Sequence, residues 1–220
     1  MISVKRRVVL AVFLACVLIG LVAQASRVFL TSELSPNLSS TSFHPPSTVE
    51  PISPIPRSLP LDDRKIALGK RLFHDARLSR DNSVACSSCH NLAQGGVDGG
   101  KRSIGIAGQQ TDRNSPTVFN AVFNLAQFWD GRAATLEDQI DGPVNNPKEM
   151  ASSWPAVVAK LAEDAEYRAA FDGIYGGMEP RHIKNAIADF ERSLLTPGSR
   201  FDRYLDGDRQ NVFDRARGFR

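Results

Sequence analysis

A run of five residues, Cys86-Ser87-Ser88-Cys89-His90, constrains this chain more than any other part of it. Two thiols three positions apart, followed at once by an imidazole, form the C-x-x-C-H pattern at which a haem is attached covalently. Each thiol can form a thioether to one edge of the porphyrin, and His90 then becomes the proximal ligand of the iron. The motif therefore predicts a fold in which haem c replaces part of the protein core.

Two other uses of these residues stay open on spacing alone. A structural zinc site needs four ligands, usually as two pairs, but the remaining cysteine, Cys16, lies in an apolar N-terminal run and no other histidine pairs at zinc-like spacing. A disulfide between Cys86 and Cys89 is the competing oxidised state in an exported protein. The adjacent His90 favours haem over both alternatives.

The first 25 residues are organised like a secretory signal peptide. Basic Lys5-Arg6-Arg7 precedes an apolar run from Val8 to Ala23, and Ala23-Gln24-Ala25 forms a small-x-small cleavage site. The run is short for a membrane span, which needs ~20 residues, although an uncleaved anchor is the alternative. Export to the periplasm agrees with c-type haem and argues against a cytosolic zinc or redox role for the cysteines.

The rest of the chain divides into a spacer and one domain. Residues 26–58 are rich in Ser, Thr and Pro and are expected to form a flexible linker, because they cannot bury enough apolar surface to offset the entropy of ordering. Residues 59–220 are long enough for a single domain with its own core. The formal net charge of +3 has both signs interspersed, so nothing indicates a nucleic-acid partner.

The apolar spacing within residues 59–220 is helical, and strand-like alternation is scarce. Capping and stop signals predict helices at Asp62 or Asp63 to Phe73, Thr135–Ile140, Trp154–Leu161, Ala165–Phe171 and Glu179–Leu195. A further helical pattern starts at Asn211, and the glycine-rich stretch after His90 predicts loop. The expected fold is an all-α, cytochrome c-like haem domain with long irregular loops.

Several short motifs follow one another in a fixed order around the haem motif. They are Leu68-Gly69-Lys70-Arg71-Leu72-Phe73, Asp75-Ala76-Arg77-Leu78-Ser79, Gly95-Gly96-Val97-Asp98, Asn114-Ser115-Pro116-Thr117 and Phe128-Trp129-Asp130-Gly131-Arg132-Ala133. In this order they closely resemble the bacterial di-haem cytochrome c peroxidases, which include the MauG-like proteins. The resemblance covers about residue 60 to residue 220 and implies a peroxidatic domain, which reduces hydrogen peroxide with electrons from a small cytochrome c or a cupredoxin.

The resemblance also implies roles for single residues. Glu149 is similar to the family's acid/base glutamate, and Gln139 to the glutamine of its distal pocket. Trp129 resembles the tryptophan placed between the two haems on the proposed electron path, and Asn114 resembles a calcium ligand. Members of the family are commonly dimers, so a homodimer is one state to test. Independently, peroxide cleavage needs a base that takes a proton from one oxygen and returns it to the other, which suits a buried carboxyl such as Glu149.

The chain departs from the family pattern at two places. In many members a histidine follows Ser-Ile-Gly after the first haem motif, whereas here Ile106 follows Ser103-Ile104-Gly105, and isoleucine cannot bind iron. We therefore expect an open distal face in the ferric state. The sequence also holds no second C-x-x-C-H, which leaves the expectation of a truncated or interrupted di-haem gene whose product lacks the C-terminal haem domain.

An electron-transfer cytochrome with one haem is the competing function. Such a carrier normally needs a sixth iron ligand, often methionine, that closes the distal face. Met150 and Met178 are the candidates outside the signal region, and Met150 directly follows Glu149. The two functions therefore compete for the same stretch of chain.

Overall fold

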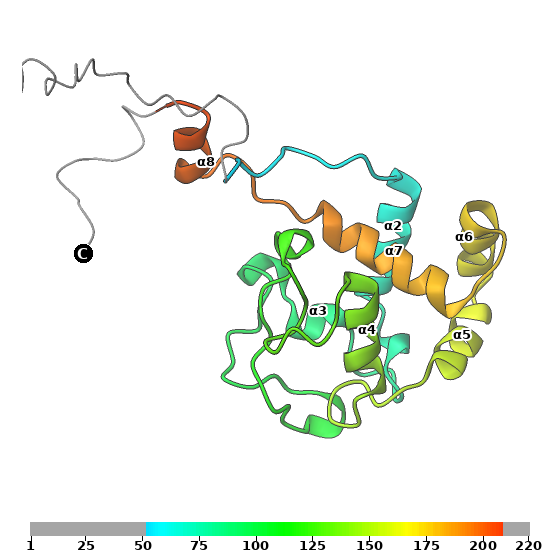
Figure 1. Ribbon diagram of the computed structural model, residues 1–220. Coiled ribbons are helices and arrows are strands. Elements are labelled where there is room, and N and C mark those ends of the chain that lie inside the picture. The colour runs from blue at the N-terminus through cyan, green and yellow to red at the C-terminus, as the bar shows by residue number, and fades with distance from the viewer. Residues whose placement is uncertain (1–51, 209–220) are drawn as a thin grey trace, which may run out of the picture. The chain divides into compact units, whose positions relative to one another are not determined.

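The computed structural model describes residues 52–208. The predicted signal peptide, most of the predicted linker and the helical pattern that begins at Asn211 lie outside the described residues. The described residues form helices joined by long loops, and their only β structure is two isolated antiparallel bridges (Figure 1). The all-α prediction is confirmed. Within residues 52–208, no helix is long and apolar enough to cross a membrane.

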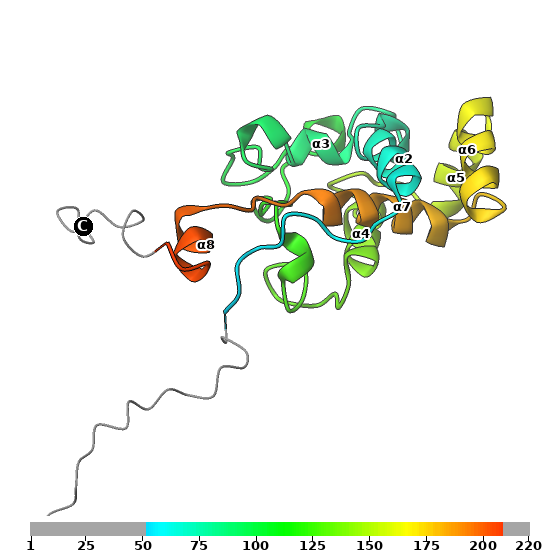
Figure 2. The same ribbon diagram turned by 90° about the horizontal axis from the view of Figure 1, so that it is seen from above.

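The two helices at the centre of the domain lie more than one hundred residues apart in the sequence. Helix α2 (Asp63–Phe73) begins at the predicted cap Asp62, which accepts a hydrogen bond from the Arg64 amide at 2.9 Å. It crosses α7 (Pro180–Ser193), which buries a continuous apolar stripe (Figures 1 and 2). The helices approach closely at Gly69, where a Cβ atom would lie 1.8 Å from the Ala186 carbonyl oxygen.

Other helices are arranged around this pair, namely α3 (Cys86–Cys89), α4 (Leu136–Asn145), α5 (Trp154–Ala162) and α6 (Ala165–Tyr175). Helix α8 (Arg200–Leu205) follows α7 after an extended segment. Helices α5 and α6 lie beside the first half of α7 in both views, and α4 packs against α7. Helix α8 is tied to the start of the described chain by the Ile55 amide, which donates to Asp202 Oδ1 at 3.1 Å.

Helix α4 is longer than the sequence predicts. The predicted end is Ile140, but the helix continues through Gly142 and Pro143 to Asn145. Glycine and proline disfavour a helix interior, yet the added turn buries Val144 to 1% exposure. Burial of this side chain outweighs the local preference, because tertiary packing supplies most helical stability in proteins.

One lysine fixes the turn that leads into the haem motif. The Lys160 ammonium group of α5 has three N–H donors and lies within hydrogen-bond distance of four acceptors, which are the carbonyl oxygens of Arg77, Ser79 and Arg80 and the Oδ1 atom of Asn82. These acceptors lie in the segment between α2 and α3, so α5 holds the approach to α3 in place.

Candidate functional site

A cavity of about 680 Å³ lies between α3, α4 and the loops that connect them. Cavities of roughly 300–1,000 Å³ are typical of cofactor sites. All the site residues predicted from the sequence line this cavity, namely Cys86, Cys89, His90, Asn114, Trp129, Gln139 and Glu149. His74, His182 and Met178 are not among its lining residues, whereas Met150 is.

The haem motif has the local geometry that attachment requires. The single turn of α3 begins and ends at the two cysteines, which places both thiols on one side of the helix. Both are free thiols. His90 Nδ1 lies 3.2 Å from the Gly96 carbonyl oxygen. A proton on Nδ1 in this hydrogen bond leaves Nε2 with its lone pair for a metal, the arrangement that orients histidine ligands.

Burial dominates the electrostatics of the motif. Burial, and next the negative charge of Glu191, raise the pKa of the Cys86 thiol to about 12. Burial also raises the pKa of the Cys89 thiol and lowers the pKa of His90. Both thiols are therefore protonated at neutral pH in the chain without a cofactor. The described part of the chain also holds no group of three or more side chains that could bind a metal ion.

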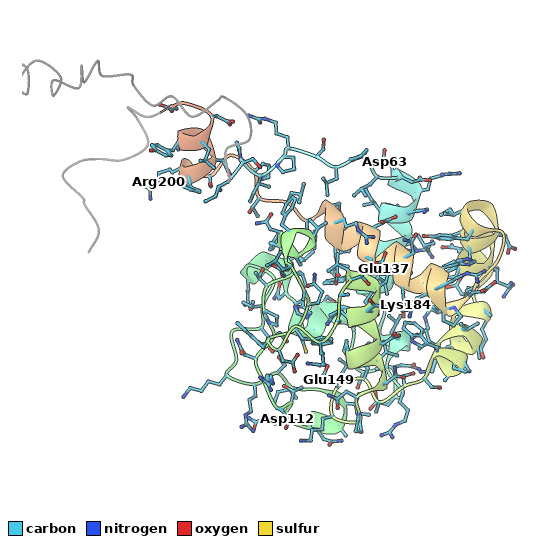
Figure 3. All side chains as sticks on the ribbon, in the orientation of Figure 1. Asp63, Asp112, Glu137, Glu149, Lys184 and Arg200 are labelled. Carbon is cyan, nitrogen blue, oxygen red and sulfur yellow. The ribbon has the colours of Figure 1, made fainter. Side chains whose placement is uncertain are left out.

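Glu149 lies on the cavity wall in a turn that follows α4 (Figure 3). Asn146 Nδ2 donates to Glu149 Oε1 at 2.8 Å, and the other end of the same amide accepts from the Lys148 backbone at 2.9 Å. Burial raises the pKa of the Glu149 carboxyl, while the Asn146 hydrogen bond and the Arg132 charge oppose this rise. Glu149 is thus a carboxyl whose pKa is shifted towards neutrality and whose second oxygen, Oε2, is free of protein hydrogen bonds among the described residues.

The loop after the haem motif packs directly onto the backbone of this turn. A Cβ atom on Gly105 would lie 1.9 Å from the Lys148 carbonyl oxygen, so only glycine fits there. The Ile106 amide donates to the Glu149 carbonyl oxygen at 2.9 Å. The Ile106 side chain is fully buried in the hydrophobic core and is not among the cavity-lining residues. Position 106 therefore offers the cavity neither a ligand nor a side chain.

The remaining predicted residues lie on α4 and at the mouth of the cavity. Gln139 is half-buried, and its amide makes no hydrogen bond to another residue in the described part of the chain. The Trp129 ring is 60% exposed, and its Nε1 donates to the Asn114 carbonyl oxygen at 3.2 Å. Two residues that the sequence assigned to separate roles are thus in direct contact. Calcium binding at Asn114 stays a prediction.

Sequence reasoning missed three residues of the site. Asn146 orients Glu149, and Arg132 lines the cavity with its guanidinium carbon 3.4 Å from the centre of the Phe128 ring. Glu191 of α7 also lines the cavity and is only 6% exposed. A signal for Glu191 exists in the sequence, because it lies four residues after the buried Ile187 and shares the apolar stripe of its helix.

Comparisons with known proteins agree with this geometry. The di-haem cytochrome c peroxidase family matches residues 63–210. The chain is 53% identical over 161 residues to cytochrome c peroxidase Ccp of Escherichia coli K12, covering 72% of this chain and 35% of that protein. It is 48% identical over 162 residues to cytochrome c551 peroxidase of Nitrosomonas europaea, covering 73% and 48%. Over 170 residues it is 41% identical to methylamine utilization protein MauG of Methylorubrum extorquens, covering 76% and 48%.

Solved structures show the same likeness. A MauG-like protein associated with microbial copper homeostasis superposes with a TM-score of 0.62 at 33% identity, covering 73% of this chain and 49% of that one. The chain spans between 35% and 48% of the length of the three sequence relatives. The family match covers most of the described residues, including the haem motif and its cavity, so this chain belongs to the di-haem cytochrome c peroxidase family.

Proposed function

We propose that this domain is the peroxidatic haem domain of a periplasmic peroxidase that reduces hydrogen peroxide to water. The proposed electron donor is a small cytochrome c or a cupredoxin. One observation carries the proposal: a single cavity is lined both by the C-x-x-C-H motif and by Glu149, a carboxyl from a distant part of the sequence. The periplasmic location rests on the signal-like N-terminus.

Three residues of the C-x-x-C-H motif would bind the cofactor. Cys86 and Cys89 would hold the porphyrin through thioethers, and His90 would bind the iron through Nε2. When bound, this haem supplies the redox-active iron at which hydrogen peroxide is reduced. Ile106 is buried in the core, so the distal face is proposed to be open in the ferric state.

Glu149 is proposed to move the proton. Its Oε1 atom is held by Asn146, so Oε2 takes the proton from one oxygen of hydrogen peroxide. Glu149 then returns this proton to the other oxygen, which leaves as water. The complete reaction consumes one hydrogen peroxide, two electrons and two protons and yields two waters.

Gln139 and Trp129 have supporting roles in this proposal. The Gln139 amide, which makes no hydrogen bond to a described residue, would hold the peroxide in the orientation that proton transfer needs. Trp129, exposed at the cavity mouth, would lie on the electron path. Calcium at Asn114 and a homodimer remain parts of the proposal that rest on the family resemblance.

The proposal is tested by mixing the ferric, haem-loaded chain with hydrogen peroxide in a stopped-flow instrument. Glu149→Gln should lower the second-order rate constant by about 10²- to 10⁴-fold, the usual contribution of a general acid/base. Glu163→Gln is the matched control, because Glu163 is exposed and lies outside this cavity. Equal rates for the wild type and Glu149→Gln would remove Glu149 from the acid/base role.

The second candidate function is a one-haem electron-transfer cytochrome. The observation that favours it is Met150, which lines the cavity and is 3% exposed. A methionine bound to ferric iron gives a characteristic charge-transfer band, and in that case Met150→Leu would abolish it. The peroxidase proposal predicts no such band, and a low-spin bis-histidine spectrum of the ferric protein would contradict the open distal face.

A further inference from the structure

A second carboxyl, Glu191, lines the haem cavity and has no part in the proposed peroxide chemistry. It lies on α7, is 6% exposed, and makes no side-chain hydrogen bond or ion pair with another described residue. Burying a carboxylate without a partner is costly, so proteins rarely do so outside functional sites. The Glu191 carboxyl is therefore available to interact with a cofactor that occupies the cavity.

No described side chain forms an ion pair that would neutralise the negative charge of the Glu191 carboxylate. The adjacent Arg192 directs its guanidinium to Glu137 of α4 and to Asp189, at 2.8 Å each. The groups that act on the carboxyl are Arg192, which favours its ionised form, and Glu137, which opposes it. On α3 the nearby titratable group is Cys86, a thioether position and not an iron ligand. Burial is the largest effect and raises the pKa of Glu191 to about 8.

We propose that Glu191 couples the charge of a haem held in this cavity to proton uptake. The carboxylate stabilises the ferric state, because opposite charges attract more strongly at a buried position, where the effective dielectric constant is lower than in water. When an external donor adds one electron to the iron, that attraction is lost. Glu191 then takes up one proton from solvent, so electron and proton enter together and the charge of the site is unchanged.

The other cavity carboxyl, Glu149, is less suited to this coupling. Glu149 accepts a hydrogen bond from Asn146 and feels the nearby Arg132 charge, and both favour its ionised form. Among the described residues, none donates a hydrogen bond that would hold the Glu191 carboxyl ionised. The inference rests on the haem of the proposed function but not on peroxide reduction.

The first test is the reduction potential of the haem-loaded chain, measured by spectroelectrochemistry without peroxide from about pH 6 to about pH 9. In the wild type the potential should fall as pH rises, approaching about 59 mV per pH unit, which is one proton per electron and a tenfold change per unit. Glu191→Gln should flatten this slope and raise the potential at the alkaline end, because the negative charge is gone. Glu149→Gln should keep the wild-type slope. Equal slopes in the wild type and Glu191→Gln would overturn the proposal.

A second measurement does not depend on a Glu191 variant that binds haem. In the reduced-minus-oxidised infrared difference spectrum, the wild type labelled with ¹³C-glutamate should gain a protonated-carboxyl band that shifts with the label. The band should persist in Glu149→Gln. Its absence from the wild type, or its loss in Glu149→Gln, would refute the assignment to Glu191. Neither measurement contains peroxide, so failure here is distinct from failure of the peroxidase proposal.

Discussion

The Asn146 amide shows how one side chain sets the chemistry of another. It donates to Glu149 through Nδ2 and accepts from Lys148 through Oδ1, so both ends of the amide are fixed. The hydrogen bond stabilises the ionised carboxylate and lowers the pKa of Glu149, against burial, which raises it. Asn146 is therefore a positioning residue whose effect should be visible in a pH profile.

Asn146→Ala is expected to move the acidic limb of the peroxide-reaction profile to higher pH. Without the donor, the pKa of Glu149 rises, so a larger fraction of the carboxyl is protonated and unable to act as a base at a given pH. The measurement is the stopped-flow rate across pH. Asn145→Ala is the control, because the exposed Asn145 side chain donates only to the Asp141 carbonyl oxygen among described residues. An unshifted limb in Asn146→Ala would show that the amide does not tune Glu149.

Asp75 is a second residue with a shifted pKa, and its expected effect is on the stability of the fold. The Asp75 side chain, 11% exposed, accepts from the Arg77 guanidinium at 2.7 Å and from the Tyr167 hydroxyl at 2.9 Å. Burial by itself would raise the pKa of Asp75, but the hydrogen bonds of Arg77 and Tyr167 hold it below its usual value. A carboxyl with a lowered folded-state pKa stabilises the fold at pH values above its unfolded pKa, and this contribution is lost as pH falls through the folded pKa.

Asp75→Asn should thus lower the free energy of unfolding by about 2 kcal/mol at neutral pH, the range of hydrogen bonds to charged groups. The difference from the wild type should shrink below about pH 4, where Asp75 of the wild-type chain becomes protonated, first in the unfolded and then in the folded state. Denaturant unfolding at both pH values measures this. Asp172→Asn, at an exposed position of α6, should change stability little, and a pH-independent loss in Asp75→Asn would show that ionisation is not the cause.

At the scale of elements, α2 and α7 form the most extensive helix–helix contact among the described residues. Asp62 as a cap and the apolar stripe of α7 predict both helices, and the structure confirms them. The same local signals misplace the end of α4, because the burial of Val144 that extends it comes from distant residues. The end of a helix can be predicted from sequence where a local capping residue sets it. It cannot be predicted where contacts with residues distant in the sequence set it.

Gly69→Ala should destabilise the domain by about 3 kcal/mol, at the upper end of overpacking costs. Its new Cβ would meet the Ala186 backbone oxygen at 1.8 Å, and a backbone atom cannot move aside cheaply. Gly173→Ala is a matched control within α6, where nothing lies within 4 Å of the added Cβ. There the substitution should stabilise by about 0.5–1 kcal/mol, the helix preference of alanine over glycine. Equal effects at both sites, by denaturant unfolding, would contradict the close approach.

For the whole molecule, the sequence predicted which residues gather at one cavity better than it predicted the course of the loops that enclose it. The C-x-x-C-H motif and the order of the family motifs placed Cys86, Cys89, His90, Trp129 and Glu149 around one site, and all line the cavity. The course of the connecting loops could not be predicted, because it depends on left-handed backbone at non-glycine residues such as Phe128 (φ 67°) and Ala151 (φ 47°). Such conformations cost about 1–3 kcal/mol and persist only when the surroundings impose them.

The contrast between the packed helices and the irregular loops predicts two levels of local stability in the domain. The α2–α7 pair carries much of the apolar core, whereas residues 103–129 contain only short 3₁₀ turns and isolated β-bridges and line a cavity on one side. Hydrogen exchange should therefore protect the amides of α2 and α7 in both the haem-free and the haem-loaded chain. The amides of residues 103–129 should be protected only in the loaded chain, because the haem supplies the contacts that the cavity lacks. A Cys86→Ser/Cys89→Ser variant provides the haem-free protein. The wild-type chain, produced without export and kept reduced so that no haem is attached, is the control for the effect of the two substitutions. Equal protection of residues 103–129 in both forms would show that the cavity walls are ordered by the protein alone.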